Sequence, residues 1–175
     1  MKRSLITPVL LLLSVAIAAA RPDMSVARPG STPYDPYHAP VTAVLRKLDG
    51  PAPSFSRVAE LTKQSFSFRY VFDEPYRAQT PQETAAKRSG DCKAKSLWLA
   101  SRMNDANVRY VIGKARRESK ISHAWLMWQN KGRWWVLDPT NNPSPIPADK
   151  IGPNEYIIHY SYDKNGSYRH GKRHG

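Results

Sequence analysis

The sequence contains a single cysteine, Cys92, among 175 residues, which excludes an intrachain disulfide and any multi-cysteine zinc or iron–sulfur site. Acidic residues are also scarce: 14 Asp and Glu stand against 27 Lys and Arg, for a formal net charge of +13. This balance favours contact with anionic surfaces and excludes an acidic, solvating chain. No apolar run reaches the roughly 20 residues that a membrane-spanning helix needs. What remains is a hydrophobic content of 41%, enough for the packed core of one ordinary domain.

The N-terminus has the layout of an export signal. Two basic residues precede an uncharged stretch over 5–20, which ends in three alanines. This pattern is typical of a secretory signal peptide, residues 1–20, cleaved after Ala20. A membrane anchor is the alternative, but the run is short and Pro8 interrupts it. We therefore expect an exported protein, periplasmic or extracellular, whose mature chain has no transmembrane span.

Proline divides the rest of the chain into an arm and a domain. Seven prolines fall within residues 21–53, which predicts a Pro-rich N-terminal arm, mostly extended and without a core of its own, with a short helix over 41–48. Residues 54–163 are expected to form the functional domain. Residues 164–175 are basic and rich in Gly and His, which predicts a flexible tail.

Within the domain the pattern changes from helical to strand-like. Helices are expected over 54–64, 82–88 and 92–104, and residues 66–72 alternate in a way that also permits a strand. From Val108 onward, β-branched and aromatic residues predict strands over 108–112, 123–128, 133–137 and 156–162. Helices followed by an antiparallel sheet are the α+β arrangement.

Cys92 is expected in the first turn of its helix. Unpaired backbone N–H groups and the helix macrodipole favour a thiolate over a thiol at that place. The carboxylate of Asp91 opposes a second negative charge, and Lys93 and Lys95 partly offset it. A thiolate is the nucleophile that acyl transfer needs. The alternative for a lone cysteine is a buried, inert side chain.

His123 begins one expected strand and Asp138 ends the next, so strand pairing can bring them together. A two-residue turn closed by Gln129 and Gly132 places them directly opposite each other, close enough for a hydrogen bond. A three-residue turn ending at Gly132 shifts the register by one and sends them to opposite faces unless a bulge restores it. The pattern therefore allows a His–carboxylate pair without fixing it. Taken alone, Asp138 could also serve as a turn residue before Pro139.

Three segments carry a family resemblance: Gly-Asp-Cys-Lys-Ala-Lys-Ser-Leu over 90–97, His-Ala-Trp-Leu over 123–126 and Trp-Trp-Val-Leu-Asp-Pro-Thr over 134–140. Their order, spacing and neighbours resemble the Cys, His and Asp motifs of the transglutaminase-like superfamily, which has a papain-like fold. Residues 80–84 also resemble the approach to the cysteine in the bacterial cysteine-proteinase branch. The resemblance extends over about 66–143.

The resemblance implies a catalytic helix packed on an antiparallel β-sheet. It implies that Cys92 is the nucleophile, His123 the general base and acid, and Asp138 the carboxylate that orients the imidazole. It also implies an oxyanion hole made by the backbone N–H of Cys92 and an upstream side-chain donor, for which Gln79 and Gln82 are candidates.

Metals and cofactors are not expected. Calcium-dependent members of the proteinase branch have acidic residues directly after the cysteine, whereas Lys93 and Ala94 stand there in this chain. A zinc site built from cysteine, histidine and aspartate is disfavoured because no short ligand spacing supports it.

The resulting interpretation is an exported thiol enzyme that acts on amide bonds of a protein or peptide substrate through an acyl-enzyme. If water resolves the acyl-enzyme, the protein is a cysteine peptidase or amidase. If an amine resolves it, the protein is a protein-glutamine acyltransferase, a transglutaminase. A non-catalytic module that binds a peptide or an envelope polymer is the third hypothesis. The basic excess is spread without a recognition motif, which favours an anionic envelope surface or acidic substrate over nucleic acid.

Overall fold

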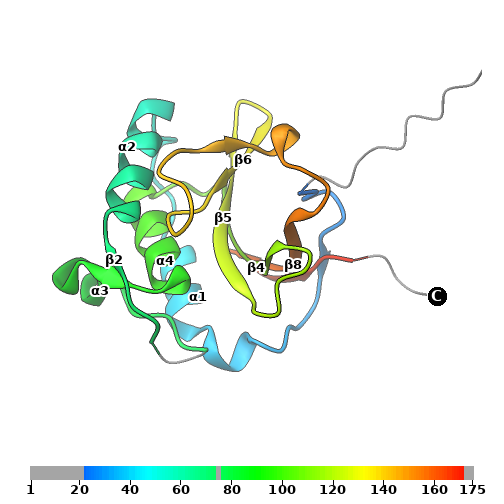
Figure 1. The fold of residues 1–175 in the computed structure, drawn as a ribbon, viewed down its shortest axis with the longest axis horizontal. Helices are drawn as coiled ribbons and strands as arrows, with labels where there is room; N and C mark the ends of the chain where they lie inside the picture. Colours follow the sequence, from blue (N-terminus) through cyan, green and yellow to red (C-terminus); the bar gives the residue numbers. More distant parts are fainter. Residues whose placement is uncertain (1–21, 74–75, 172–175) are drawn as a thin grey trace, which may run out of the picture.

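The computed structural model describes residues 22–73 and 76–171, so the expected signal peptide lies outside the described residues. Helices pack against one face of a twisted antiparallel sheet (Figure 1). The helices are η1 Asp35–Tyr37, α1 Ala39–Leu45, α2 Phe55–Phe66, α3 Pro81–Lys87, α4 Cys92–Met103 and η2 Ala148–Lys150. None of the helices formed by the described residues combines the length and apolar character needed to cross a bilayer.

The strands form one seven-stranded sheet and one short pair. In the large sheet the order is β1-β9-β8-β4-β5-β6-β7, and every neighbouring pair is antiparallel. The strands are β1 Arg28–Pro29, β2 Arg69–Tyr70, β3 Ser89–Gly90, β4 Val108–Arg116, β5 His123–Asn130, β6 Arg133–Leu137, β7 Ile146–Pro147, β8 Glu155–Asp163 and β9 Gly166–Arg169. Strands β2 and β3 pair in parallel beside the helices. The predicted α+β class is confirmed.

Helix α4 begins and ends where its capping residues predict. Asp91 is the N-cap, and its side chain accepts hydrogen bonds from the backbone N–H groups of Lys93 and Ala94. Asn104 ends the helix in the left-handed conformation, with φ 49°. Between these caps most of the helix is buried, because it lies between α2 and α3 on one side and β5 on the other.

The turn of the β5–β6 hairpin lies at different residues from those of either expected turn. Asn130 pairs with Arg133, so Lys131 and Gly132 form a two-residue turn with φ values of 49° and 77°. Positive φ at both turn residues is the combination that matches the twist of the flanking strands. The register with Gln129 and Gly132 closing the turn is therefore wrong by two residues, and the three-residue turn does not form.

A close approach between backbones bends β4 against β8. The register of that pair shifts between Ile112 and Gly113. A Cβ atom at Gly113 would lie 2.0 Å from the carbonyl oxygen of Ile157, so only glycine fits there. Gly113 also pairs with His123 on the neighbouring strand, which places this bulge beside the start of β5.

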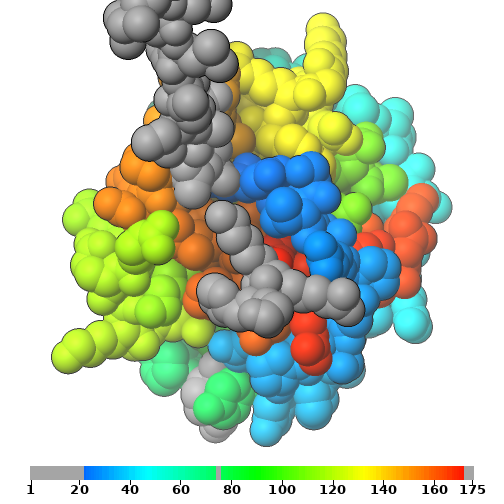
Figure 2. Space-filling view, turned by 90° about the vertical axis from the view of Figure 1, so that its right-hand side faces the viewer, coloured from blue at the N-terminus to red at the C-terminus, as the bar shows by residue number. Residues whose placement is uncertain are grey.

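The sheet separates two apolar clusters. The larger one lies between the sheet and helices α1, α2 and α4, and includes Leu97, Tyr110, Leu126 and Trp128. The smaller one covers the opposite face and includes Met24 from the N-terminal segment together with Trp125, Val136 and Ile158. Figure 2 shows the N-terminal segment (blue) running across the surface on this side of the molecule.

Two predicted boundaries are wrong. The Pro-rich arm over 21–53 contributes to the core, since Val41, Leu45 and Leu48 are buried in the larger cluster. The supposed flexible tail contains strand β9, which pairs with both β8 and β1. In both cases a short apolar or aromatic pattern within a polar, Pro- or Gly-rich stretch was enough to join the sheet or the helix layer.

Candidate active site

Cys92 is the first residue of α4 and is half-buried. It lines a pocket of about 140 Å³ together with His123, the first residue of β5. The structure therefore brings a thiol and an imidazole, 31 positions apart in the chain, to one cavity. Concave pockets with a few convergent polar groups are the usual place for chemistry.

Two hydrogen bonds fix the start of α4 against the sheet. The Ser96 hydroxyl donates to the carbonyl oxygen of Ala124 over 3.3 Å, one residue beyond His123 on β5. The Tyr110 hydroxyl donates to the carbonyl oxygen of Lys93 over 3.4 Å. These contacts hold the turn that carries Cys92 and the strand that carries His123 in one position relative to each other.

The side chains of His123 and Asp138 form a hydrogen-bonded pair. Nε2 of His123 lies 2.9 Å from Oδ2 of Asp138, which is fully buried. The two residues share a face because a register shift of two keeps every side chain on its side of the sheet. Asp138 directly follows Leu137, which pairs with Leu126. With Nε2 engaged by Asp138, Nδ1 is the ring nitrogen left to interact with Cys92.

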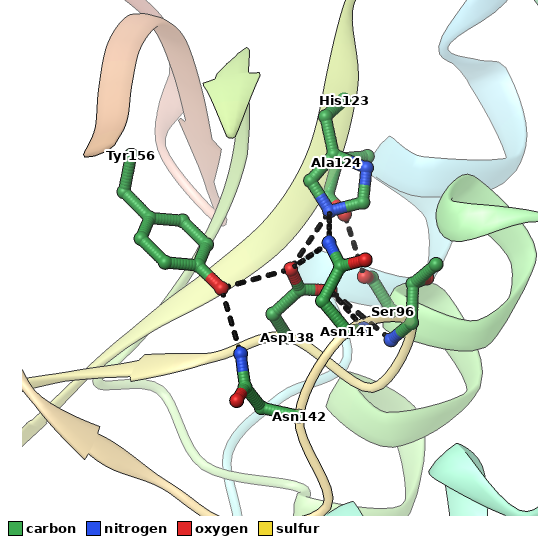
Figure 3. A network of polar contacts seen from close by, with 8 residues as sticks. Ser96, His123, Ala124, Asp138, Asn141, Asn142 and Tyr156 are labelled. Atoms are coloured by element: carbon green, nitrogen blue, oxygen red, sulfur yellow. Dashed lines mark hydrogen bonds and ion pairs between the residues drawn. The ribbon is translucent and has the colours of Figure 1, made fainter. Parts of the chain in front are cut away.

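Asp138 is surrounded by hydrogen-bond donors (Figure 3). Its Oδ2 also accepts from Nδ2 of Asn141 at 2.7 Å and from the hydroxyl of Tyr156 at 3.0 Å. Its Oδ1 accepts from the backbone N–H groups of Thr140 and Asn141 at 3.0 and 3.3 Å. Nδ2 of Asn142 in turn donates to the Tyr156 hydroxyl. This set of donors fixes a buried carboxylate in its charged form.

The charges of His123 and Asp138 shift the pKa of each other's side chain. Burial lowers the pKa of His123, but the hydrogen bonds and charges of Asp138 and Cys92 outweigh it and raise that pKa to about 10. Burial raises the pKa of Asp138, yet the bond to His123 and its positive charge bring it below the ordinary value. Burial and the charge of Asp138 raise the pKa of Tyr156, so its hydroxyl stays a donor. The arrangement therefore stabilises an imidazolium beside Cys92.

Sequence reasoning missed Asn141 and Tyr156. Asn141 has a signal in the sequence, since an Asx-rich turn directly after Asp138 brings side-chain and backbone donors back to its carboxylate. Tyr156 has none: it lies 18 residues further on, and its backbone adopts the left-handed conformation with φ 49°, which its residue type does not favour. Only the folded sheet reveals this partner.

The two glutamines considered for the oxyanion hole lie outside the pocket. Nε2 of Gln79 donates to Asp73 over 2.7 Å, and Gln82 lines a separate groove with Thr80 and Ser101. Tyr70 instead lines the pocket together with Cys92. Burial and the charge of Cys92 raise the pKa of its hydroxyl, which therefore stays protonated as a donor at the pocket wall.

The start of α4 does not fit a calcium ion. The Asp91 carboxylate is 1% exposed, accepts two backbone N–H groups, and forms an ion pair with the ammonium of Lys93. The charge of this carboxylate is thus balanced by a cation of the chain itself. Over the described ranges, no group of three or more His, Cys, Asp or Glu side chains is arranged to hold a metal ion.

Comparison with known proteins identifies relatives of the sequence and of the fold. The profile of the transglutaminase-like superfamily matches residues 39–139. Among solved structures, calcium-bound LapG of Legionella pneumophila has a TM-score of 0.54 at 16% identity, covering 74% of this chain and 77% of that one. EGTA-treated LapG of the same organism has a TM-score of 0.51 at 17% identity, covering 73% and 72%. None of the curated proteins matches in sequence. At such identities the structural likeness concerns the fold alone, and it confirms the expected core of a helix packed on an antiparallel sheet.

Proposed function

Because this chain belongs to the transglutaminase-like superfamily, we propose that it is a thiol enzyme that cleaves amide bonds of a protein or peptide substrate. The observation that carries the proposal is the charged pair of His123 and Asp138 placed beside the half-buried Cys92. A module that only bound peptides would not need an imidazole–carboxylate pair beside a thiol. The proposed roles are nucleophile for Cys92, proton acceptor and donor for His123, and orienting group for Asp138.

In the proposed reaction, Nδ1 of His123 already holds the proton taken from the Cys92 thiol before the substrate binds, and the sulfur attacks the substrate carbonyl carbon. The new S–C bond gives a tetrahedral oxyanion, which the backbone N–H of Cys92 at the open start of α4 can stabilise. His123 then donates its proton to the leaving amine as the C–N bond breaks. Water, deprotonated by His123, attacks the acyl-enzyme and releases the carboxylic acid and the free thiol.

Acyl-donor profiling tests this function directly. A diverse peptide library is incubated with the protein, with and without a biotinylated alkylamine, and products are identified by mass spectrometry. We expect new carboxyl termini without dependence on the amine, together with an acyl mass on the peptide that contains Cys92. Incorporation of the amine at glutamine side chains would instead show that the protein catalyses acyl transfer rather than hydrolysis.

Two controls make the outcome specific. The Cys92→Ala variant should form neither products nor the acyl adduct, since it lacks the attacking sulfur. Addition of EGTA should leave the wild-type rate unchanged, because Lys93 already supplies the positive charge at Asp91. Products that persist in Cys92→Ala, or no products from any library member, would contradict the proposed function.

We also propose that the enzyme works outside the cytoplasm. The support is the tripartite pattern of residues 1–20, which ends in small residues suited to cleavage. Expression of the full chain in a bacterial host should yield a mature protein that begins at Arg21, as read by N-terminal sequencing of the exported fraction. A full-length chain retained with the membranes would instead indicate an anchor.

A further inference from the structure

The pocket beside Cys92 has aromatic walls that come from three separate parts of the chain. The N-terminal segment supplies Tyr34 and His38, the stretch around β2 supplies Tyr70, Phe72 and Tyr76, and the β4–β5 connection supplies Ile121. Several of these side chains remain exposed in the free protein, at 65% for Phe72, 49% for Tyr76 and 75% for Ile121. Exposed apolar side chains gathered around a pocket indicate a surface that is covered when a ligand binds.

We infer that this pocket is a specificity pocket for an aromatic side chain of the acyl donor, next to the bond that is cleaved. The inference rests on the proposed function and names its substrate class. The volume of the pocket, about 140 Å³, is close to that of cavities of roughly 150 Å³ that hold a benzene molecule. A single ring therefore fills the space, whereas an alanine side chain leaves most of it empty.

The walls are pre-arranged for a flat ring. Tyr76 stacks on Tyr37 with ring centroids 4.8 Å apart, and Tyr34 packs edge-on against Tyr160 at 5.7 Å. The Tyr34 hydroxyl also lies 3.0 Å from the hydroxyl oxygen of Ser122, which connects the N-terminal wall to the residue before His123. Rings held by neighbouring rings lose little conformational entropy when another ring packs against them.

The charges around the pocket exclude a cationic occupant. Aromatic cages commonly take ammonium groups, but here Lys93 and the His123 imidazolium both line the cavity. Each is already neutralised by a buried carboxylate, Lys93 by Asp91 and His123 by Asp138. A lysine or arginine side chain would find no free carboxylate among the lining residues, and a carboxylate would find both cations engaged. An uncharged ring is the occupant that this lining accepts.

Part of this pocket lies outside the segment that matches the family. Tyr34 and His38 precede residue 39, where the match begins. His38 is nonetheless held firmly: Nδ1 bonds to the carbonyl oxygen of Tyr34 over 2.8 Å, and its ring stacks on Tyr162 at 4.5 Å. The N-terminal segment therefore completes a cavity whose other walls belong to the matched domain.

Peptidyl chloromethyl ketones test the inference. N-blocked phenylalanine and alanine chloromethyl ketones are each incubated with the protein, and alkylation of Cys92 is followed by intact mass. The Cys92 sulfur bonds to the methylene carbon and chloride leaves, so the rate reports binding beside the nucleophile. We expect the phenylalanine reagent to react about tenfold faster or more. Phe72→Ala and Tyr76→Ala should bring the two rates together.

Three measurements separate failure of the pocket from failure of the enzyme. Phe55→Ala removes a comparably exposed ring that does not line the pocket, and should keep the preference. Iodoacetamide, which has no side chain to place, should react equally with wild type and with both pocket variants. Binding of N-acetyl-phenylalaninamide to Cys92→Ala, followed by NMR shifts at Ser122 and Ala124, examines the pocket without any chemistry.

The outcomes divide cleanly. Equal rates for the two chloromethyl ketones, a preference that survives both pocket variants, or no shift with N-acetyl-phenylalaninamide would overturn the pocket assignment. A wild-type Cys92 that reacts with iodoacetamide no faster than Cys92 in a His123→Ala variant would count against the proposed function, whichever way the pocket measurements fall.

Discussion

Replacement of His123 by alanine is expected to lower kcat/KM for the best peptide found by profiling by about 10⁴-fold or more. The side chain lies in the same pocket as Cys92 and is held by Asp138, so its loss removes the proposed proton carrier together with the positive charge beside the sulfur. Members of such a catalytic unit act together, and removal of one costs nearly as much as removal of all.

The same variant should change how the thiol reacts with a simple reagent. The wild-type thiol should react with iodoacetamide much faster than that of His123→Ala, because the imidazole is the group beside the sulfur that can take its proton. A His159→Ala control changes a histidine on β8 that lines neither the pocket nor the Asp138 network. Equal iodoacetamide rates in wild type and His123→Ala would show that the imidazole does not act on Cys92.

Asp138→Asn is expected to lower kcat by roughly 10³- to 10⁴-fold while leaving the shape of the site intact. Without the carboxylate, the pKa of His123 should fall from about 10 toward its ordinary range, and the ring is no longer held in one tautomer. NMR titration of the His123 ring signals measures the fall directly. An exposed carboxylate bound to Arg133 offers the matched control, Asp149→Asn, which should change neither quantity. An unchanged His123 titration in Asp138→Asn would refute the role assigned to the acid.

The pair should also make stability depend on pH. The pKa of His123 rises on folding from 6.5 to about 10, so its contribution is complete below about pH 6.5 and is lost as the pH rises to about 10. The pKa of Asp138 lies below its ordinary 3.8, so its contribution is complete above that pH and is lost as the pH falls below it. Urea unfolding should therefore show a decline between pH 6.5 and 10 that is weaker in Asp138→Asn, which we expect to be less stable by about 3–5 kcal/mol at neutral pH.

The helices and the place of Cys92 in the first turn of α4 were predictable because they depend on neighbours in sequence. Asp91 as N-cap, Gly90 before it and the apolar face that follows determine where α4 begins, and this places Cys92 in its first turn. The shared face of His123 and Asp138 followed from only one of the two expected turns, since the three-residue turn would have placed them on opposite faces. An error of two residues in the hairpin register leaves both residues on the same face.

The contacts that complete the site were not predictable, because they join segments far apart in sequence. Tyr156 reaches Asp138 from a strand whose backbone conformation at that residue follows from packing rather than from residue type. The aromatic walls contributed by Tyr34 and His38 come from a segment whose prolines suggested an arm without a core. In each case tertiary packing overrode the local composition.

Gly113 shows where function can be lost without touching any reactive group. Its missing side chain lets the carbonyl of Ile157 sit over the strand beside His123, and Tyr156, the preceding residue, reaches the acid from that same backbone. A relative with all three motifs intact but a larger residue at this position would have to rebuild the β4–β8 contact. The presence of the three motifs is therefore not sufficient evidence that a relative is active. Position 113 should be among the first residues compared when relatives are sorted into active and inactive.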